Sequence, residues 1–245
     1  MLLIEEPEIY LHVHLQRHFS RLMRQIVEKG NQVVFTTHAS TFVDLERPYE
    51  IVRLHKTPEG ATTPRQVAPN LKFDFQKTKR KLRRMGNEEI VFANHAVLTE
   101  GQDDQGVSET LLRLAGVDID ARSISVVNCD GAENLPDYVR LCSALEIDFY
   151  VIHDEDDAAK NSKRNKGIAE AVQLAKPKHS SLHAYKPDLE TTLGEQKHCG
   201  LERLLSKLNG QSYEDIKKNF PKLVIPMDEF VRTRNLNSTQ RSSAT

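Results

Sequence analysis

The chain has 245 residues, of which 38% are hydrophobic and 28% charged, with a formal net charge of −1. That length suffices for one large domain or two small ones, and the composition is that of an ordinary globular protein. No apolar run approaches a membrane span, the amino terminus lacks a secretory signal, and the three cysteines form no closely spaced pair. We therefore expect a cytoplasmic protein without a membrane span, a disulfide framework or a zinc ribbon.

The first part of the chain is predicted to alternate between strands and a helix. Residues 2–5 (LLIE) form a short apolar stretch, and apolar residues then recur every three or four positions between residues 8 and 29. This spacing predicts an amphipathic helix, which Gly30 would end. Residues 32–38 (QVVFTTH) and 50–56 (EIVRLHK) predict two further strands. Strands separated by a helix favour parallel pairing in an α/β layer.

The composition changes after residue 56. Residues 57–70 are rich in Pro, Gly and Thr, which suggests a domain boundary. Residues 71–85 carry seven Lys or Arg against a single Asp and predict a basic amphipathic helix. Such a helix can follow a phosphate backbone because bound cations release condensed counterions, although a solvated charged face is the alternative. The candidate DNA-binding residues are Lys77, Lys79, Arg80, Lys81, Arg83 and Arg84.

A second α/β unit is predicted downstream. Strands are expected at residues 96–99, 123–128, 148–152 and 181–185, with helices near 105–115, 134–145 and 166–175 and short helices thereafter. The predicted organisation is a partial ATPase-like layer (1–68), a basic connecting helix (69–90), an α/β domain with C-terminal helices (91–232) and a disordered tail (233–245).

Carboxylates follow two of the predicted strands in this unit. Glu100 ends one strand, Gly101 allows a tight turn, and Asp104 lies four residues after Glu100. Asp154 and Asp156 follow the strand at 148–152 and share strand parity, so both are expected to point the same way. If the two strands are neighbours, four carboxylates meet, which is unfavourable unless a cation neutralises them. An all-oxygen set of this kind suits Mg²⁺ or Mn²⁺, and two ions are expected.

Each of these motifs alone has a structural explanation, since an isolated Glu-Gly turn is common and an isolated D-x-D is more often a loop or a helix cap. Their combination resembles the Toprim domain, which is found in type IA and type II topoisomerases, DnaG-type primases, RecR-like proteins and OLD-family nucleases. The similarity covers residues 88–195. It implies a Rossmann-like domain with a parallel central sheet.

The resemblance also implies roles for individual residues. Glu100, Asp154 and Asp156 would bind divalent metal and act on phosphodiesters, with one ion activating water and the other neutralising the leaving oxygen. Asp104 matches an acid that is frequent in the OLD branch. Glu190, in PDLETTLG, resembles an acidic element of OLD proteins and would be a metal-binding or supporting acid, unless it is only an acid at a helix N-terminus. Lys160, Lys163 and Lys166, just beyond the D-x-D, are candidates for the cation that assists with phosphate charge, and Lys160 is the one we select.

The amino-terminal strands carry a second resemblance. LLIEEPEIYLH (2–12) and VVFTTHAS (33–40) resemble the Walker B strand and the switch-histidine strand of ABC-type ATPases of the RecF, structural-maintenance and OLD type. The resemblance implies that Glu5 helps to hold magnesium, that Glu6 positions the attacking water and that His38 contacts the γ-phosphate. The alternative is a buried strand followed by solvated acids.

The sequence contains no glycine-rich phosphate loop of the form G-x-x-x-x-G-K-[ST]. We therefore expect residues 1–68 to be the C-terminal portion of an ABC-type ATPase domain whose front end lies outside this chain. ATP would bind only together with that missing half, and the chain would form a homodimer through its ATPase part. ATP hydrolysis by this chain alone is not expected.

The leading hypothesis is a metal-dependent DNA endonuclease or nickase of the OLD type, a family linked to phage defence in bacteria. A Toprim topoisomerase would need a nucleophilic tyrosine in another domain, and the six tyrosines show no such setting. A primase would need a zinc module. The non-enzymatic alternative is a RecF- or RecR-like DNA-repair module that binds DNA without cleaving it.

Overall fold

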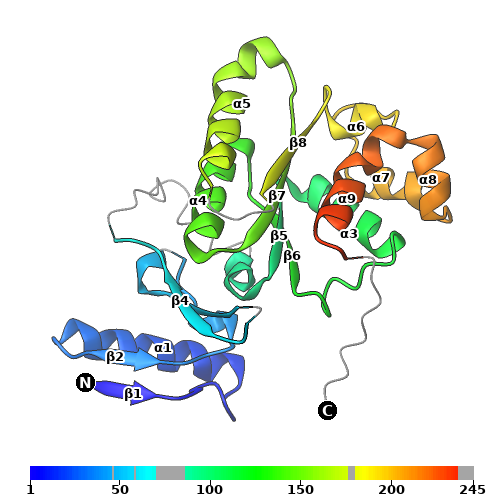
Figure 1. Cartoon of the computed structure of the whole chain (residues 1–245). Coiled ribbons are helices and arrows are strands. Elements are labelled where there is room, and N and C mark those ends of the chain that lie inside the picture. The colour runs from blue at the N-terminus through cyan, green and yellow to red at the C-terminus, as the bar shows by residue number, and fades with distance from the viewer. Residues whose placement is uncertain (46, 58, 70–85, 176–179, 237–245) are drawn as a thin grey trace.

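The computed structural model describes residues 1–245 except 46, 58, 70–85, 176–179 and 237–245. Figure 1 shows a small N-terminal layer beside a larger sheet that is flanked by helices. The predicted α/β class with a parallel central sheet is confirmed. The basic helix predicted at 71–85, with Lys77 to Arg84, lies outside the described residues.

The N-terminal layer is a pair of parallel strands with one helix. β1 (Leu2–Ile4) pairs with β2 (Val33–Phe35), and α1 (Val13–Glu28) connects them, as the apolar spacing predicts. α1 is described throughout and has no fully buried side chain. In this layer one helix packs on two strands, and the helix and the strands remain largely exposed to solvent.

The predicted third strand belongs to a different sheet. β3 (Val52–Lys56) pairs antiparallel with β4 (Thr62–Gln66), and Gly60, with φ +86°, lies in the turn between them. β4 occupies much of the stretch that its Pro, Gly and Thr content suggested as a boundary. The hairpin tolerates Pro64 because no strand beyond β3 pairs with β4 in the described part of the chain.

This hairpin packs on the larger part of the molecule. Val67, just after β4, is 1% exposed and joins the core beneath the central sheet. Arg53 of β3 donates hydrogen bonds to the carbonyl oxygens of Ala93 at 2.8 Å and Leu145 at 3.1 Å. The β3–β4 hairpin, which follows the N-terminal layer in the chain, is thus attached to the central part of the molecule, and we call it the joint.

The central sheet has the strand order β6-β5-β7-β8, and all its strands are parallel. β5 (His95–Thr99) and β7 (Asp148–Asp154) are neighbours in the middle, with β6 (Ile124–Asn128) and β8 (Ser181–Tyr185) outside them. Thr99 lies opposite Ile152, so the C-terminal ends of β5 and β7 meet at the same edge. Ligands of parallel α/β sheets collect at this edge.

Helices cover both faces of the sheet (Figure 1). One face packs against α4 and α5 through a core that includes Leu98, Val151 and Ile168, and the other packs against α3, α7 and α9 through Val97, Ile152 and others. The helices are α3 (Gln102–Leu114), α4 (Leu135–Leu145), α5 (Ala158–Gln173), α6 (Leu189–Thr192), α7 (Leu201–Leu208), α8 (Tyr213–Asn219) and α9 (Pro221–Thr233).

Two segments differ from the sequence-based expectation. α5 begins at Ala158, where a polar loop was expected, because the Asp157 side chain accepts hydrogen bonds from two backbone N–H groups of the first turn. The tail expected from residue 233 is packed as far as residue 236: Arg234 donates to the Phe149 carbonyl at 2.8 Å, and Leu236 is 5% exposed. Among the described helices, none has the length and apolarity needed to cross a bilayer.

Candidate active site

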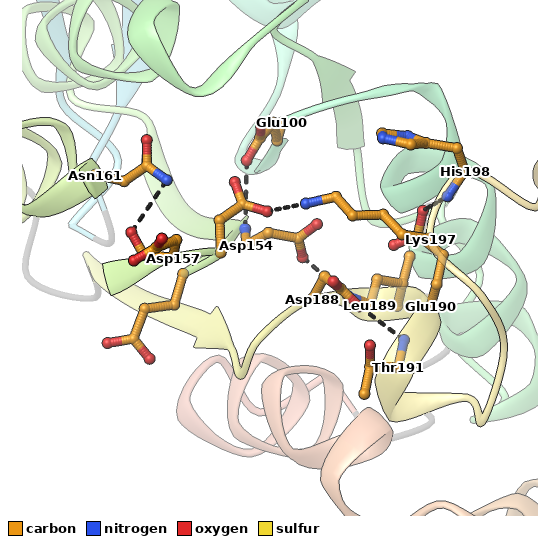
Figure 2. A network of polar contacts seen from close by, with 12 residues as sticks. Glu100, Asp154, Asp157, Asn161, Asp188, Leu189, Glu190, Thr191, Lys197 and His198 are labelled. Atoms are coloured by element: carbon orange, nitrogen blue, oxygen red, sulfur yellow. Dashed lines mark hydrogen bonds and ion pairs between the residues drawn. The ribbon is translucent and has the colours of Figure 1, made fainter. Parts of the chain in front are cut away.

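Glu100 and Asp154 meet at the C-terminal edge of the central sheet. Glu100 directly follows β5, and Asp154 is the last residue of β7. Because these strands are paired, the Glu100 carboxylate reaches the neighbouring strand end and accepts a hydrogen bond from the Asp154 backbone N–H at 3.3 Å (Figure 2). The strand pairing expected from the sequence is confirmed.

Asp104 lies in the first turn of α3, close to Glu100. Its Oδ2 accepts a hydrogen bond from the Gly101 N–H at 3.0 Å, which caps the helix. Its Oδ1 is buried and has no hydrogen-bond partner among the described residues. Burial, followed by the nearby Glu100 charge, raises the pKa of Asp104 to about 7. This carboxyl group is therefore short of a positively charged partner.

Asp154 is in the same electrostatic situation. One of its oxygens accepts a hydrogen bond from the Leu189 N–H at 3.0 Å. Burial, followed by the charges of Asp104 and Glu100, nevertheless raises its pKa to about 8. The pKa of Glu100 is also raised, first by burial. We call Glu100, Asp104, Asp154 and the nearby Glu190 the carboxylate cluster.

Asp156 has different surroundings from Asp154. β7 ends at Asp154, and Asp156 has φ +53°, so the strand alternation that predicted both side chains on one side does not extend to Asp156. Arg164 of α5 donates from both terminal nitrogens to Asp156 Oδ2 at 3.2 Å, and the Lys197 ammonium contacts Oδ1. Burial alone would raise the pKa of Asp156, but these two cations lower it below its ordinary value.

Glu190 joins the cluster from α6. The helix is capped by Asp188, whose side chain accepts from the Thr191 N–H at 2.8 Å (Figure 2). Glu190 is 7% exposed, and its Oε1 accepts a hydrogen bond from the His198 N–H at 2.9 Å. Its charge contributes to the raised pKa of both Asp104 and Asp154. Asp188 thus caps α6, and the Glu190 carboxylate lies near the cluster and is bound by the backbone N–H of His198.

Lys197 was not singled out from the sequence. It lies in the connection between α6 and α7, where Gly194, His198 and Gly200 have positive φ angles. A close packing of α7 on α3 brings this connection to the site: a Cβ on Gly106 would lie 2.7 Å from Leu201 Cδ1. Since this contact depends on a glycine and a leucine 95 positions apart, no local sequence signal could have found it.

Lys160, the lysine chosen from the sequence, is placed differently. Its side chain is 84% exposed and its ammonium lies 3.3 Å from Asp157. Arg164, one turn further along α5, is the residue of this helix that contacts Asp156, and it also donates to the Asp154 carbonyl at 2.9 Å. The structure thus brings together Glu100, Asp104, Asp154, Asp156, Glu190, Arg164 and Lys197, and leaves Lys160 outside.

The residues of the cluster fit a divalent cation by their chemistry. All the side-chain donors are carboxylate oxygens, which suit Mg²⁺ or Mn²⁺, and Asp104 offers a buried oxygen without a partner. In the described part of the chain, however, no group of three or more His, Cys, Asp or Glu side chains already has the arrangement of a metal site. Asp156 is engaged by Arg164 and Lys197, so its carboxylate would have to change partners to act as a ligand.

The ends of β1 and β2 bring two of the predicted nucleotide-site residues together. Glu6 Oε1 and His38 Nε2 lie 3.6 Å apart, while Glu5 is exposed. Glu8, which was not singled out, accepts hydrogen bonds from the Thr37 hydroxyl at 2.9 Å and the His38 N–H at 2.6 Å. Burial alone would raise the pKa of Glu8, but these hydrogen bonds lower it. Glu8 therefore orients the backbone that carries His38.

Two family models match the chain. One described as "Overcoming lysogenization defect protein-like, TOPRIM domain" matches residues 91–156, and one described as "AAA ATPase domain" matches residues 1–43. The first contains Glu100, Asp104, Asp154 and Asp156. The second contains Glu5, Glu6 and His38.

Two relatives are similar to most of the chain. An OLD nuclease of Thermus scotoductus is 31% identical over 212 residues, covering 78% of this chain and 40% of the relative. The Old nuclease of Escherichia phage P2 is 20% identical over 161 residues, covering 64% of this chain and 28% of the relative. The chain therefore spans less than half the length of these two relatives.

Solved structures give a weaker likeness. The C-terminal region of the Burkholderia pseudomallei OLD protein is 15% identical with a TM-score of 0.36, covering 56% of this chain and 87% of that one. The corresponding region of the Xanthomonas campestris pv. campestris OLD protein is 18% identical with a TM-score of 0.33, covering 58% and 81%.

Proposed function

Because this chain belongs to the OLD family of nucleases, we propose that it is a metal-dependent DNA endonuclease or nickase that cleaves phosphodiester bonds at the carboxylate cluster. The observation that carries the proposal is the raised pKa of Asp154, about 8, beside Asp104 and Glu100 on neighbouring elements. Carboxyl groups with mutually raised pKa values in one place are typical of a site that a cation completes.

The proposed ligands are Glu100, Asp104 and Asp154, with Asp156 and Glu190 completing the set. Mg²⁺ or Mn²⁺, two ions in all, would supply activation of a water molecule and neutralisation of the leaving oxygen. The chain's own residues orient these ligands: the Gly101 N–H fixes Asp104, the Leu189 N–H fixes Asp154, and the His198 N–H fixes Glu190. Each of these hydrogen bonds comes from the backbone, so the ligand directions are set by the fold.

Lys197 and Arg164 supply positive charge at the same edge. Both contact Asp156, and the Lys197 side chain is 45% exposed, so its ammonium is accessible to a phosphate that approaches the cluster. We propose that Lys197, rather than Lys160, neutralises charge on the reacting phosphodiester. Arg164 would hold the turn that carries Asp154 and Asp156.

The N-terminal layer is proposed to be part of an ATP-binding unit. In this unit Glu5 would hold magnesium, Glu6 would position the attacking water and His38 would contact the γ-phosphate. These roles require the remaining part of the ATPase domain. We propose that ATP and homodimerisation through this part act on the nuclease in the full assembly. We also propose a role in phage defence in the bacterial cytoplasm, and the three free cysteines agree with a reducing compartment.

One observation favours a second candidate function. The Asp156 carboxylate is paired with the side chains of Arg164 and Lys197. Among the described residues, no three His, Cys, Asp or Glu side chains are arranged to bind a metal ion. A RecF- or RecR-like module that binds DNA without cleaving it would be compatible with this arrangement. In that case Lys197 and Arg164 would permanently take the place of the ions beside Asp156.

Plasmid cleavage separates the candidates. The purified chain would be incubated with supercoiled plasmid and Mg²⁺ or Mn²⁺, with chelator as the negative control, and compared with Asp154→Asn and Glu155→Gln. Glu155 is the matched control because it lies between the two aspartates but pairs with Lys186 at 3.2 Å, away from the cluster.

The two-metal proposal expects nicked or linear plasmid with the parent and Glu155→Gln, and none with Asp154→Asn. Retained plasmid binding without nicks from any variant would favour the binding module. Relaxed, covalently closed plasmid without nicks would favour a topoisomerase-type enzyme.

A further inference from the structure

The first half of α5 carries an exposed basic face beside the carboxylate cluster. Residues 158–169 contain four Lys or Arg and neither Asp nor Glu. Arg164 turns toward the site and contacts Asp156, whereas Lys160, Lys163 and Lys166 are exposed, Lys160 at 84% and Lys166 at 77%. We call these three residues the lysine face.

The partners of the lysine face are weak and solvated. Lys160 lies 3.3 Å from Asp157, and Lys166 lies 3.7 Å from Glu170. Ion pairs this exposed contribute little to stability, so they give no structural reason for gathering three lysines on one helix. They leave the ammonium groups open to an external anion.

Gly167 is a second observation on the same face. It lies inside α5, one turn after Lys163 and two turns after Lys160, where glycine disfavours the helix relative to alanine. A Cβ at this position would meet no heavy atom of the described residues within 4 Å. Packing within the described chain therefore does not require a glycine here, whereas close approach of an external backbone would.

The position of the lysine face relates it to the site. Arg164 of the same helix donates to the carbonyl oxygen of Asp154, a member of the carboxylate cluster, at 2.9 Å, and Lys160 lies one helical turn before Arg164. Figure 2 shows Asn161 of α5 close to Asp157 at this edge of the sheet. At 1.5 Å per residue, Lys160 and Lys166 are about 9 Å apart along the helix axis, which corresponds to the axial rise of roughly two to three nucleotides of one DNA strand.

A cluster of carboxylates repels a polyanion unless cations lie beside it. From the lysine face and Gly167 together, we propose that the exposed side of α5 binds the phosphate backbone of the nucleic acid strand that runs from the carboxylate cluster. This inference rests on the proposed function for its substrate class. It gives Lys160 a role in strand binding outside the reacting bond.

Binding is measured with the full chain in chelator, so that cleavage is not required. The probe is a fluorescein-labelled 30-nucleotide single-stranded DNA, and its anisotropy is followed over a series of salt concentrations. Lys160→Gln, Lys163→Gln and Lys166→Gln are combined in one variant. The matched control combines Lys218→Gln, Lys222→Gln and Arg232→Gln, three exposed positions on α8 and α9 and therefore outside α5.

The lysine-face variant is expected to bind at least about tenfold more weakly, and the slope of log affinity against log salt should fall by about 2, because each lost phosphate contact removes about 0.7 for a single strand. The control variant should match the parent in both. Equal losses in the two triple variants, or no loss in the lysine-face variant, would overturn the inference.

Gly167→Ala tests whether the DNA backbone approaches α5 closely at this position. The substitution should raise the stability of the protein and lower its affinity for the probe. The variant should melt about 2 °C higher, because alanine favours the helix, and yet bind the probe more weakly. Higher stability with unchanged affinity would remove Gly167 from the proposed surface.

Parallel plasmid cleavage in Mg²⁺ distinguishes this inference from the proposed function. A parent that binds through the lysine face but does not cleave would contradict the nuclease and keep the surface. A parent that cleaves, with a lysine-face variant that binds like the parent, would keep the nuclease and contradict the surface.

Discussion

Two edges of this molecule have parallel strands that end in acidic residues, but they differ in burial. At the edge of the central sheet, Asp104 is 7% exposed, and burial together with its neighbours raises its pKa to about 7. At the end of β1 and β2, Glu5 is exposed and the Glu6 side chain is 38% exposed. The same sequence signal, an apolar strand followed by acids, thus produces strongly coupled carboxyl groups only where helices cover both faces of the sheet.

The difference shows that the number of acids at a strand end does not determine their chemistry. Desolvation is the first cause of the raised pKa values of Glu100, Asp104 and Asp154, and mutual charge adds to it. Glu5 and Glu6 stay more exposed because no side chain of β1, β2 or α1 is fully buried, so the layer that carries them has little core.

Removing one carboxylate from each edge should give the largest contrast. Glu100→Gln is expected to reduce plasmid cleavage by about 10³-fold, because it takes a charged oxygen donor from the proposed metal site. Glu6→Gln should leave cleavage by this chain within about twofold, since Glu6 lies at the other edge. Initial rates of nicking in Mg²⁺ measure both. A comparable loss in the two variants would contradict the assignment of cleavage to the central edge.

Metal addition should stabilise the central edge. An ion at about 100 times its dissociation constant adds about 2.7 kcal/mol to the free energy of unfolding, which raises the melting temperature by roughly 5–10 °C for a chain of this size. Melting of the chelated protein with added Mn²⁺ or Mg²⁺ measures the effect. Asp154→Asn should abolish the shift and Glu6→Gln should keep it; the reverse pattern would move the metal to the N-terminal layer.

The pH dependence of stability should come from the central edge. Asp104 and Asp154 have folded pKa values of about 7 and 8, above the ordinary 3.8, so the folded chain retains protons that the unfolded chain has released. Their contribution to stability is complete at low pH and is lost as the pH rises through 7 and 8.

We therefore expect the chelated protein to lose several kcal/mol of unfolding free energy between about pH 5 and pH 9, measured by denaturant titration. Asp154→Asn should flatten this dependence, because the amide carries no charge to repel Asp104. A profile as steep in Asp154→Asn as in the parent would show that the carboxylate cluster is not its source.

The joint between the two parts should depend more on Arg53 than on the exposed ion pairs of α1. Arg53→Ala removes hydrogen bonds to the Ala93 and Leu145 carbonyls and is expected to cost about 2 kcal/mol of unfolding free energy. Arg24→Ala breaks pairs with Asp44 and Glu50 that lie nearer the surface and should cost under about 1 kcal/mol. Urea denaturation compares them, and equal costs would mean that the hairpin adds no specific attachment.

Sequence reasoning predicted the elements of the central sheet well. The strand at 181–185 and the α4 region were expected nearly at their observed bounds, because apolar runs and turn residues punctuate this part of the chain. It missed β4, because a strand with Pro64 in a segment rich in Gly and Thr has no apolar alternation. It also missed the first two turns of α5, where lysines and asparagines hide a helix whose start depends on the Asp157 cap.

The sequence by itself determined the strands of the central sheet, most of its helices and the acids that follow the strands, because these features depend on local periodicity and on residues a few positions apart. Only the tertiary structure decided which acids interact. Asp154 and Asp156 are two positions apart, yet the pKa of one is raised and that of the other is lowered. The physical reason is that Asp104 and Glu100 approach the first, while Lys197, 41 positions away, approaches the second. Such long-range charges, and the burial that strengthens them, exist only once the chain has folded.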